Sequence, residues 1–259
     1  MTVYSKEGTD LSAARSRAVS AVALTGFGLA VLTALAVALA GLGSRWGWWH
    51  FRTGFEILKW GGYAGLAAAA VSLIGSVAAR PGGTRRGFVP AVAGLIIALV
   101  VAGVPWQWKQ TAGRVPPIHD ITTDTENPPA FIAILPLRAD APNPAAYGGP
   151  EIAAQQRAGY PNMGPLILPV PPALAFDRAL GAARDLCWKI VDSNPNNGRI
   201  EATDTTFWFG FKDDIVVRVT PSENGSRIDV RSVSRVGRSD VGTNARRIEK
   251  FFQKVTRHE

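Results

Sequence analysis

Cysteine and histidine, which often act in catalysis and metal binding, are scarce in this sequence of 259 residues. Cys187 is the only cysteine, which excludes an internal disulfide bond and any Cys-x-x-Cys metal or redox motif. We expect it to be a small buried side chain on a helix. The three histidines are His50, His119 and His258. A Ser-His-Asp catalytic set needs three groups in one geometry. His50 lies at the expected membrane interface and His258 is next to the C-terminus, so only His119 could serve, and the sequence shows no catalytic signature.

Charge is absent from three long stretches and uneven elsewhere. The formal net charge is +8. Up to Lys109 there are ten basic and three acidic residues, whereas residues 110–259 hold eighteen basic and seventeen acidic ones. The basic excess therefore belongs mostly to the flanks of the uncharged stretches, and no nucleic-acid partner needs to be invoked.

The uncharged stretches are apolar runs bounded by basic residues. They lie between Arg17 and Arg45, between Lys59 and Arg80, and between Arg86 and Lys109. A helix needs about 20 apolar residues to cross the hydrocarbon core, and in lipid only a helix satisfies its own backbone polar groups. The sequence therefore predicts a membrane anchor over residues 1–109, with three transmembrane helices at about 18–42, 60–79 and 87–108.

Two parts of this anchor admit an alternative. Ala38-Leu39-Ala40 resembles a signal-peptidase site, but the first run is longer than a signal-peptide core and two more runs follow it. The loop 43–59 is either a simple connection or a short amphipathic helix along the interface. Tryptophans border this loop and end the third run, as an aromatic belt would: Trp46, Trp48, Trp49, Trp60, Trp106 and Trp108.

Small residues crowd the apolar runs. Gly26 and Gly28 lie in the first run, and Gly61, Gly62 and Gly65 lie in the second. Small side chains allow helices to approach closely in lipid. We therefore expect the three helices to pack together or against copies of themselves in a homo-oligomer. No ionisable residue lies deep in any run, which argues against a transporter core or a proton relay.

The distribution of basic residues predicts an orientation. The N-terminal tail and the second loop carry six Lys or Arg residues, and the opposite side carries five. The positive-inside rule then places the N-terminus in the cytoplasm and the C-terminal domain in the periplasm. The predicted location is the inner, or cytoplasmic, membrane, crossed several times.

Residues 110–259 predict a soluble α+β domain with an antiparallel sheet packed against helices. The expected elements are a possible strand near 131–135, a long irregular excursion at 139–165, a helix from Pro171-Pro172 towards Ile190, a strand over 199–211, a turn at 212–214, strands at 215–220 and 227–233, and a last helix to about Arg257. Asn224-Gly225 predicts a hairpin between the last two strands. Ser239 or Asp240 is a suitable N-cap for the last helix.

Two stretches of this domain carry a family resemblance. Ile118-His119-Asp120-Ile121-Thr122-Thr123-Asp124 and the segment from Ser234 to Ile248, with its Gly237-Arg238-Ser239-Asp240-Val241-Gly242 core, resemble a bacterial and plastid family of unknown function called DUF1499. The resemblance implies a domain over most of 116–252, behind a membrane anchor in the bacterial members. It implies no activity.

The first stretch is one candidate site. His119, Asp120, Asp124 and Glu126 place an imidazole and three carboxylates within eight residues. Such a cluster could bind a hard cation, although the spacing matches no EF-hand, or His119 and Asp120 could act in acid–base catalysis. The plainer alternative is a structural turn in which Asp and Thr side chains bind local backbone amides. The sequence identifies neither a metal nor a cofactor.

The second stretch is another candidate. Its ligand-binding residues would be Arg235, Arg238, Ser239, Asp240 and Asn244, near the N-terminus of the last helix, where anions are favoured. Residues 227–257 hold nine basic and three acidic residues. The alternative is a capped helix whose arginines pair with the acidic residues of the first stretch. Both interpretations predict that the two stretches meet in space.

Consecutive aromatics form a third candidate. Phe207, Trp208, Phe209 and Phe211 in a strand would present one face to the core and the other outwards. They could line a groove for an apolar ligand, or they could simply pack in the core.

Two functions follow from these observations. The first is a membrane-anchored, exported binding or scaffolding module that acts on an envelope lipid, cell-wall material or a protein partner. The second is a hydrolase or metal-dependent enzyme centred on His119, Asp120 and Asp124. A sensor is disfavoured because the N-terminal tail is too short to hold an output domain.

Overall fold

The computed structural model describes residues 18–257 and contains three apolar helices followed by an α+β domain, so the expected fold class is confirmed. The polar tail up to Arg17 and His258 lie outside the described residues. Two compact units are present. Of the described residues, the first unit comprises 18–40 and 52–106, and the second comprises 41–51 and 107–257.

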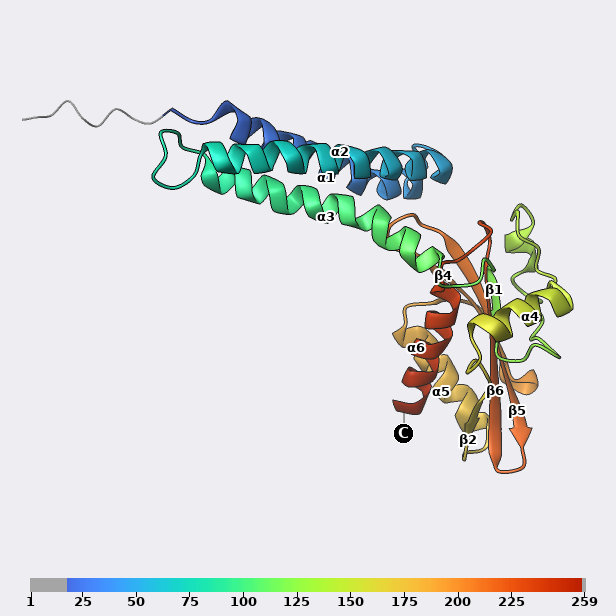
Figure 1. The fold of residues 1–259 in the computed structure, drawn as a ribbon. Helices are drawn as coiled ribbons and strands as arrows, with labels where there is room; N and C mark the ends of the chain where they lie inside the picture. Colours follow the sequence, from blue (N-terminus) through green and yellow to red (C-terminus); the bar gives the residue numbers. More distant parts are fainter. Residues whose placement is uncertain (1–17, 258–259) are drawn as a thin grey trace, which may run out of the picture. The chain divides into compact units, whose positions relative to one another are not determined.

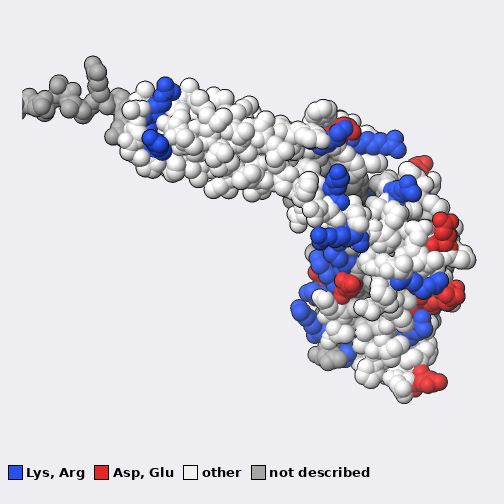
Figure 2. All heavy atoms as spheres, in the orientation of Figure 1, with Lys and Arg blue, Asp and Glu red and all other residues white. Residues whose placement is uncertain are grey.

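The three N-terminal helices are each long and apolar enough to cross a membrane. They are α1 (Ala21–Arg45), α2 (Phe51–Ala78) and α3 (Phe88–Ala112) (Figure 1). In Figure 2 the middle of this helical unit shows no basic or acidic side chain. The second helix begins at Phe51 rather than near residue 60, because residues 51–59, which were expected to be part of the loop 43–59, are helical.

Close packing within the first unit depends on small residues. A methyl group added at Gly26 would lie 2.8 Å from the Cα atom of Ser72, and one at Gly94 would lie 2.8 Å from the Cα atom of Phe27. One at Gly75 would lie 2.7 Å from the Cα atom of Ala23. The helix backbones therefore touch where no side chain intervenes, as expected for helices associated in lipid.

The second unit is built on a six-stranded antiparallel sheet. Its strands are β1 (Asp120–Thr122), β2 (Leu166–Leu168), β3 (Lys189–Asn194), β4 (Arg199–Thr205), β5 (Lys212–Ser222) and β6 (Gly225–Ser234). The main order is β1-β6-β5-β4-β3, and β2 pairs with the first part of β6. The hairpin predicted at Asn224-Gly225 joins β5 to β6, where Ser222 pairs with Gly225.

One face of the sheet carries the apolar core. The helices α5 (Pro172–Asp185) and α6 (Thr243–Arg257) cover this face (Figure 1). Alternate residues of β5, such as Ile215 and Val217, meet Ile248 and Phe251 of α6 in a cluster of buried side chains. The alternation of a strand sends the intervening β5 residues, Asp214 among them, to the opposite face.

The opposite face is covered by the segment between β1 and α4 (Gly149–Gly159), which includes the short 3₁₀ helix η1 (Leu135–Arg138). A second short 3₁₀ helix, η2 (Pro195–Asn197), joins β3 to β4. Phe131 and Ile134 of the covering segment pack on Val216 and Val233. The rest of this interface is charged, and it contains most of the buried ion pairs described below.

Several expectations for the domain are wrong in detail. Residues 131–135 form no strand, Ile190 lies in β3 instead of a helix, and residues 212–214 begin β5 instead of turning the chain. Segment 139–165, expected to be irregular, contains α4. Cys187 is exposed and lies just after α5 with φ of 58°, because the helix ends at Asp185 and the chain must reverse into β3.

Candidate functional site

The first polar stretch begins with a buried ion pair. Asp120 on β1 accepts two hydrogen bonds from Arg231 on β6, at 3.0 Å from Nε and 2.7 Å from Nη2. Both side chains are almost fully buried. The guanidinium also lies 5.3 Å from the centre of the Phe131 ring and 5.4 Å from that of Tyr147. Both carboxylate oxygens of Asp120 are therefore occupied, and none of the described hydrogen bonds joins Asp120 to the imidazole of His119.

The next acidic residue closes a turn and binds arginines. One oxygen of Asp124 accepts from the backbone N–H groups of Glu126 and Asn127 at 3.2 and 2.9 Å. Its other oxygen lies 2.9 Å from Arg218 and 3.2 Å from Arg227. Both arginines also reach the buried Asp229 of β6. The structural turn is therefore observed, and the carboxylate is shared between two guanidinium groups.

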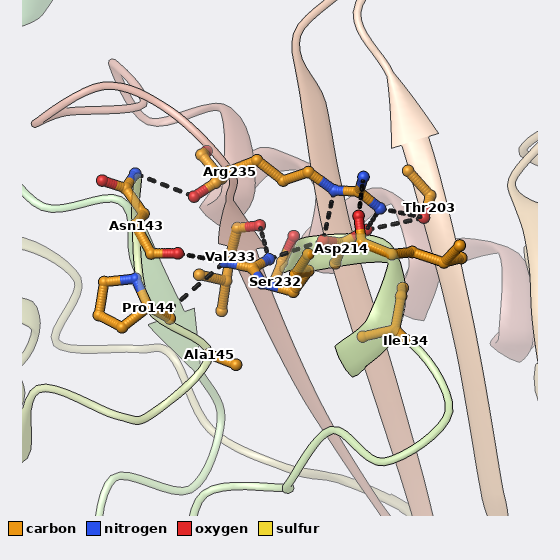
Figure 3. Close-up of polar contacts among 12 residues, drawn as sticks. Ile134, Asn143, Pro144, Ala145, Thr203, Asp214, Ser232, Val233 and Arg235 are labelled. Carbon is orange, nitrogen blue, oxygen red and sulfur yellow. Dashed lines mark hydrogen bonds and ion pairs between the residues drawn. The ribbon is translucent and has the colours of Figure 1, made fainter. Parts of the chain in front are cut away.

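A second buried network holds the covering segment on the sheet (Figure 3). Asp214 on β5 accepts from Arg138 of η1 at 2.7 Å and from Arg235 at 2.8 and 2.9 Å. Thr203 on β4 donates to the same carboxylate at 2.7 Å. Asn143 of the covering segment donates to the carbonyl oxygen of Ser234 at 2.9 Å. Arg235 is thus an internal ion-pair partner of Asp214 and not of the first polar stretch.

The carboxylate of Glu201 fixes another part of the same segment. It is fully buried on β4 and accepts from the backbone N–H groups of Ile132, Ala133 and Ile134 at 2.9 to 3.1 Å. Charge-assisted bonds to backbone donors are strong, so these three amides bend around the carboxylate. Because these three N–H groups donate to Glu201, they are not available for pairing with a neighbouring strand, and residues 131–135 form no strand.

The second polar stretch contains the start of α6. The carboxylate of Asp240 accepts from the backbone N–H groups of Gly242 at 2.9 Å and Asn244 at 2.6 Å. It therefore binds N–H groups at the start of α6, but it lies three residues before Thr243, the first residue of the helix, and not at the predicted N-cap position. Burial raises the pKa of Asp240, and these two hydrogen bonds oppose the rise. Ser239 accepts a bond from Val241 N–H. Arg238 is exposed.

The two polar stretches meet in space through the backbone. Ser234 N–H donates to the carbonyl oxygen of His119 at 3.0 Å, and the buried Asn244 side chain donates to the same oxygen at 3.0 Å. Asp240 N–H donates to Ile118. The candidate side chains nevertheless do not converge, because Asp120, Asp124 and Arg235 lie on the opposite face of the sheet from Asn244.

Arg247 organises the region beside Asn244. Its guanidinium donates to Asp204 at 2.8 Å and to Asp213 at 2.5 Å. It also contacts Asn244, whose oxygen accepts a bond from Ser232. The Arg247 side chain is 5% exposed. Each of the three guanidinium nitrogens donates to at least one acceptor, which fixes the position of this side chain.

A pocket of about 240 Å³ opens next to Arg247. Its lining comes from the end of α5, the end of β4 and the first turns of α6: Leu186, Trp188, Asp204, Thr243, Arg246, Arg247 and Lys250. Three cations and one carboxylate give this lining a formal charge of +2. Arg246 binds helix-terminal oxygens of Val241 and Thr243, whereas Lys250 makes no hydrogen bond or ion pair with residues 18–257.

Of these pocket residues, none was among the predicted ligand-binding positions. The excess of basic residues at 227–257 and the spacing of Arg246 and Lys250, one helical turn apart, were the available signals. Asp204 and Trp188 also line the pocket. Nothing in the sequence indicated that these two residues lie beside α6. Glu126, predicted as a ligand, is exposed and contacts only Arg157 at 3.3 Å among the described ion pairs.

The aromatic run is a loop and not part of a strand. β4 ends at Thr205, and the backbone of Thr206 binds both Gly210 and Phe211. Phe209 is buried and stacks on Phe211, with ring centres 5.3 Å apart. The predicted alternation of these side chains across a strand is therefore wrong, because the loop turns at Gly210, whose φ is +70°.

The described residues define a small α+β domain with a charged, covered sheet face, preceded by three helices suited to a membrane. Within residues 18–257, no group of three His, Cys, Asp or Glu side chains could hold a metal ion. The chain belongs to DUF1499, a family described as proteins of unknown function, whose model matches residues 120–255. No curated protein and no solved structure matches this chain.

Proposed function

We propose that this protein is a membrane-anchored binding module of the bacterial cell envelope. Its α+β domain would stand on the periplasmic side of the inner membrane and bind an anionic group of an envelope lipid or cell-wall component. The binding site would be the pocket at the start of α6. The predicted hydrolase or metal-dependent enzyme has less support, because Asp120 and Asp124 are occupied by arginines.

The observation that carries this proposal is the composition of the pocket. Arg247 is almost fully buried and bound by two carboxylates, so it adds a fixed positive charge to the lining and no free hydrogen-bond donor. Lys250 and Arg246 are exposed cations on the same helix. Trp188 supplies an aromatic wall, so a phosphate or carboxylate attached to an organic group suits the site.

The proposal is tested with inorganic phosphate and the full chain in phosphatidylcholine nanodiscs. Isothermal titration calorimetry should show saturable binding, and the double variant Arg246→Gln/Lys250→Gln should weaken it at least about tenfold, since a hydrogen bond to a charged group contributes about 1.5–3 kcal/mol. Arg257→Gln is the matched control, because Arg257 is an exposed cation of α6 outside the pocket. Absence of binding, or an equal loss in Arg257→Gln, would refute the proposal.

A further inference from the structure

The loop between β4 and β5 exposes a large aromatic side chain without an obvious structural reason. Phe207 is 83% exposed, the largest exposed fraction among the large hydrophobic side chains of the described residues. Loop backbone bonds hold it there, because Thr206 N–H donates to Phe211 at 2.8 Å and the Thr206 hydroxyl accepts from Phe211 N–H at 2.9 Å. The exposed Phe207 side chain therefore lies in a loop whose ends are joined by hydrogen bonds.

The same unit places other aromatic and basic residues against this loop. Arg45 donates to the carbonyl oxygens of Thr206 and Phe207 at 3.0 and 2.7 Å. The rings of Phe51 and Phe211 are 5.5 Å apart, and those of Trp108 and Trp208 are 5.4 Å apart. All of these residues belong to the second compact unit. The residues that contact the loop thus lie at the ends of the apolar helices: Arg45 is the last residue of α1, Phe51 is the first residue of α2, and Trp108 lies near the end of α3.

Two exposed tryptophans follow shortly after Arg45 in the sequence. Trp46 is 53% exposed and Trp48 is 63% exposed, and their rings lie 4.8 Å apart. Tryptophan side chains concentrate at the level of lipid headgroups, where one part of the ring is in an apolar environment and the other is hydrated. Arg45, over the Phe207 ring at 5.9 Å, has the charge and reach to contact lipid phosphate.

From these contacts we infer that the loop 206–211 is a second membrane contact, in which Phe207 inserts into the headgroup layer of the bilayer. This inference rests on the proposed membrane anchoring and adds a contact made by the α+β domain itself. The occupant is lipid, because the loop shares its cluster with residues flanking helices suited to a bilayer. An exposed phenylalanine next to a cation and tryptophans is the composition of an interfacial anchor.

The depth of a spin label at position 207 tests this inference. In a Cys187→Ser background, Phe207→Cys is labelled with a nitroxide and the full chain is placed in phosphatidylcholine nanodiscs. The matched control is Glu223→Cys, an exposed position in the turn at the other end of β5. Electron paramagnetic resonance power saturation then compares accessibility to oxygen, which enters lipid, and to a water-soluble nickel chelate.

The expected result is a label at 207 that is several-fold less accessible to the nickel chelate than the label at 223, and more accessible to oxygen. A label at 207 that is as accessible to nickel as the label at 223 would overturn the inference while leaving the anchor intact. A chain that fails to co-purify with the nanodiscs would instead refute the membrane anchoring, and the loop contact with it.

Discussion

At the scale of single residues, the carboxylates of the first polar stretch act in folding and not at an open site. Asp120 is buried against Arg231, and Asp124 is shared by Arg218 and Arg227. Buried charges are retained only when they are paired and hydrogen-bonded. The polar residues that make this stretch recognisable therefore fasten β1 and its following turn to β6.

Replacing Asp120 by Asn should destabilise the domain by about 3–5 kcal/mol, since the buried guanidinium of Arg231 would lose its counter-charge. Urea unfolding of the full chain in mild detergent, followed by near-ultraviolet circular dichroism, measures this loss. Glu126→Gln is the control from the same stretch. Its ion pair with Arg157 is exposed, so its effect should stay below about 1 kcal/mol. Equal effects of the two substitutions would contradict the structural role of Asp120.

At the scale of elements, the first unit depends on close contacts between helix backbones. Gly26 on α1 faces Ser72 on α2, while Gly28, two residues further along α1, has open space beside it. The two glycines thus differ in environment within one helix. Because lipid is as apolar as a leucine side chain, packing and not burial from water decides whether these helices associate.

A leucine at position 26 should therefore separate α1 from α2, whereas a leucine at position 28 should be tolerated. Overpacking typically destabilises by about 1–3 kcal/mol. Unfolding of the full chain by sodium dodecyl sulfate, followed by far-ultraviolet circular dichroism, should shift to lower detergent fractions for Gly26→Leu. An unchanged midpoint for Gly26→Leu, or an equal shift for Gly28→Leu, would be inconsistent with this packing.

The elements that sequence reasoning predicted are those with strong local signals. The β5–β6 hairpin follows from Asn224-Gly225 and the alternation around it, and α6 follows from its apolar face. The short strands β1 and β2 lack such signals, since each gains its hydrogen bonds from β6. Consecutive aromatics at 207–211 suggested a strand because aromatic residues favour strands, whereas the chain turns at Gly210 and Thr206 binds Phe211 across the loop.

The candidate site was harder to predict for a physical reason. A pocket that joins Trp188, Asp204 and Lys250 draws on three elements whose meeting depends on how α5 and α6 cross the sheet. The sequence indicated the basic excess around α6, but not which cations are already paired. Arg235 illustrates this, because its partner Asp214 lies on β5 and was expected in a turn at 212–214.

At the scale of the whole molecule, three helices suited to a membrane precede a domain that carries the proposed binding pocket. This order suits a module that meets its ligand close to a bilayer surface. A pocket for an anionic group would then encounter lipid headgroups or anionic cell-wall material, provided that the domain faces the periplasm. The side of the membrane on which the domain stands is therefore decisive.

The most direct measurement is the activity of alkaline phosphatase fused after Glu259, compared with a fusion after Gly83 in the loop between α2 and α3. Phosphatase is active only outside the cytoplasm. We predict an active fusion after Glu259, an inactive fusion after Gly83, and retention of both in the membrane after alkaline carbonate washing. An inactive fusion at Glu259 with an active one at Gly83, or release of the full chain by carbonate, would contradict a periplasmic, membrane-anchored binding module.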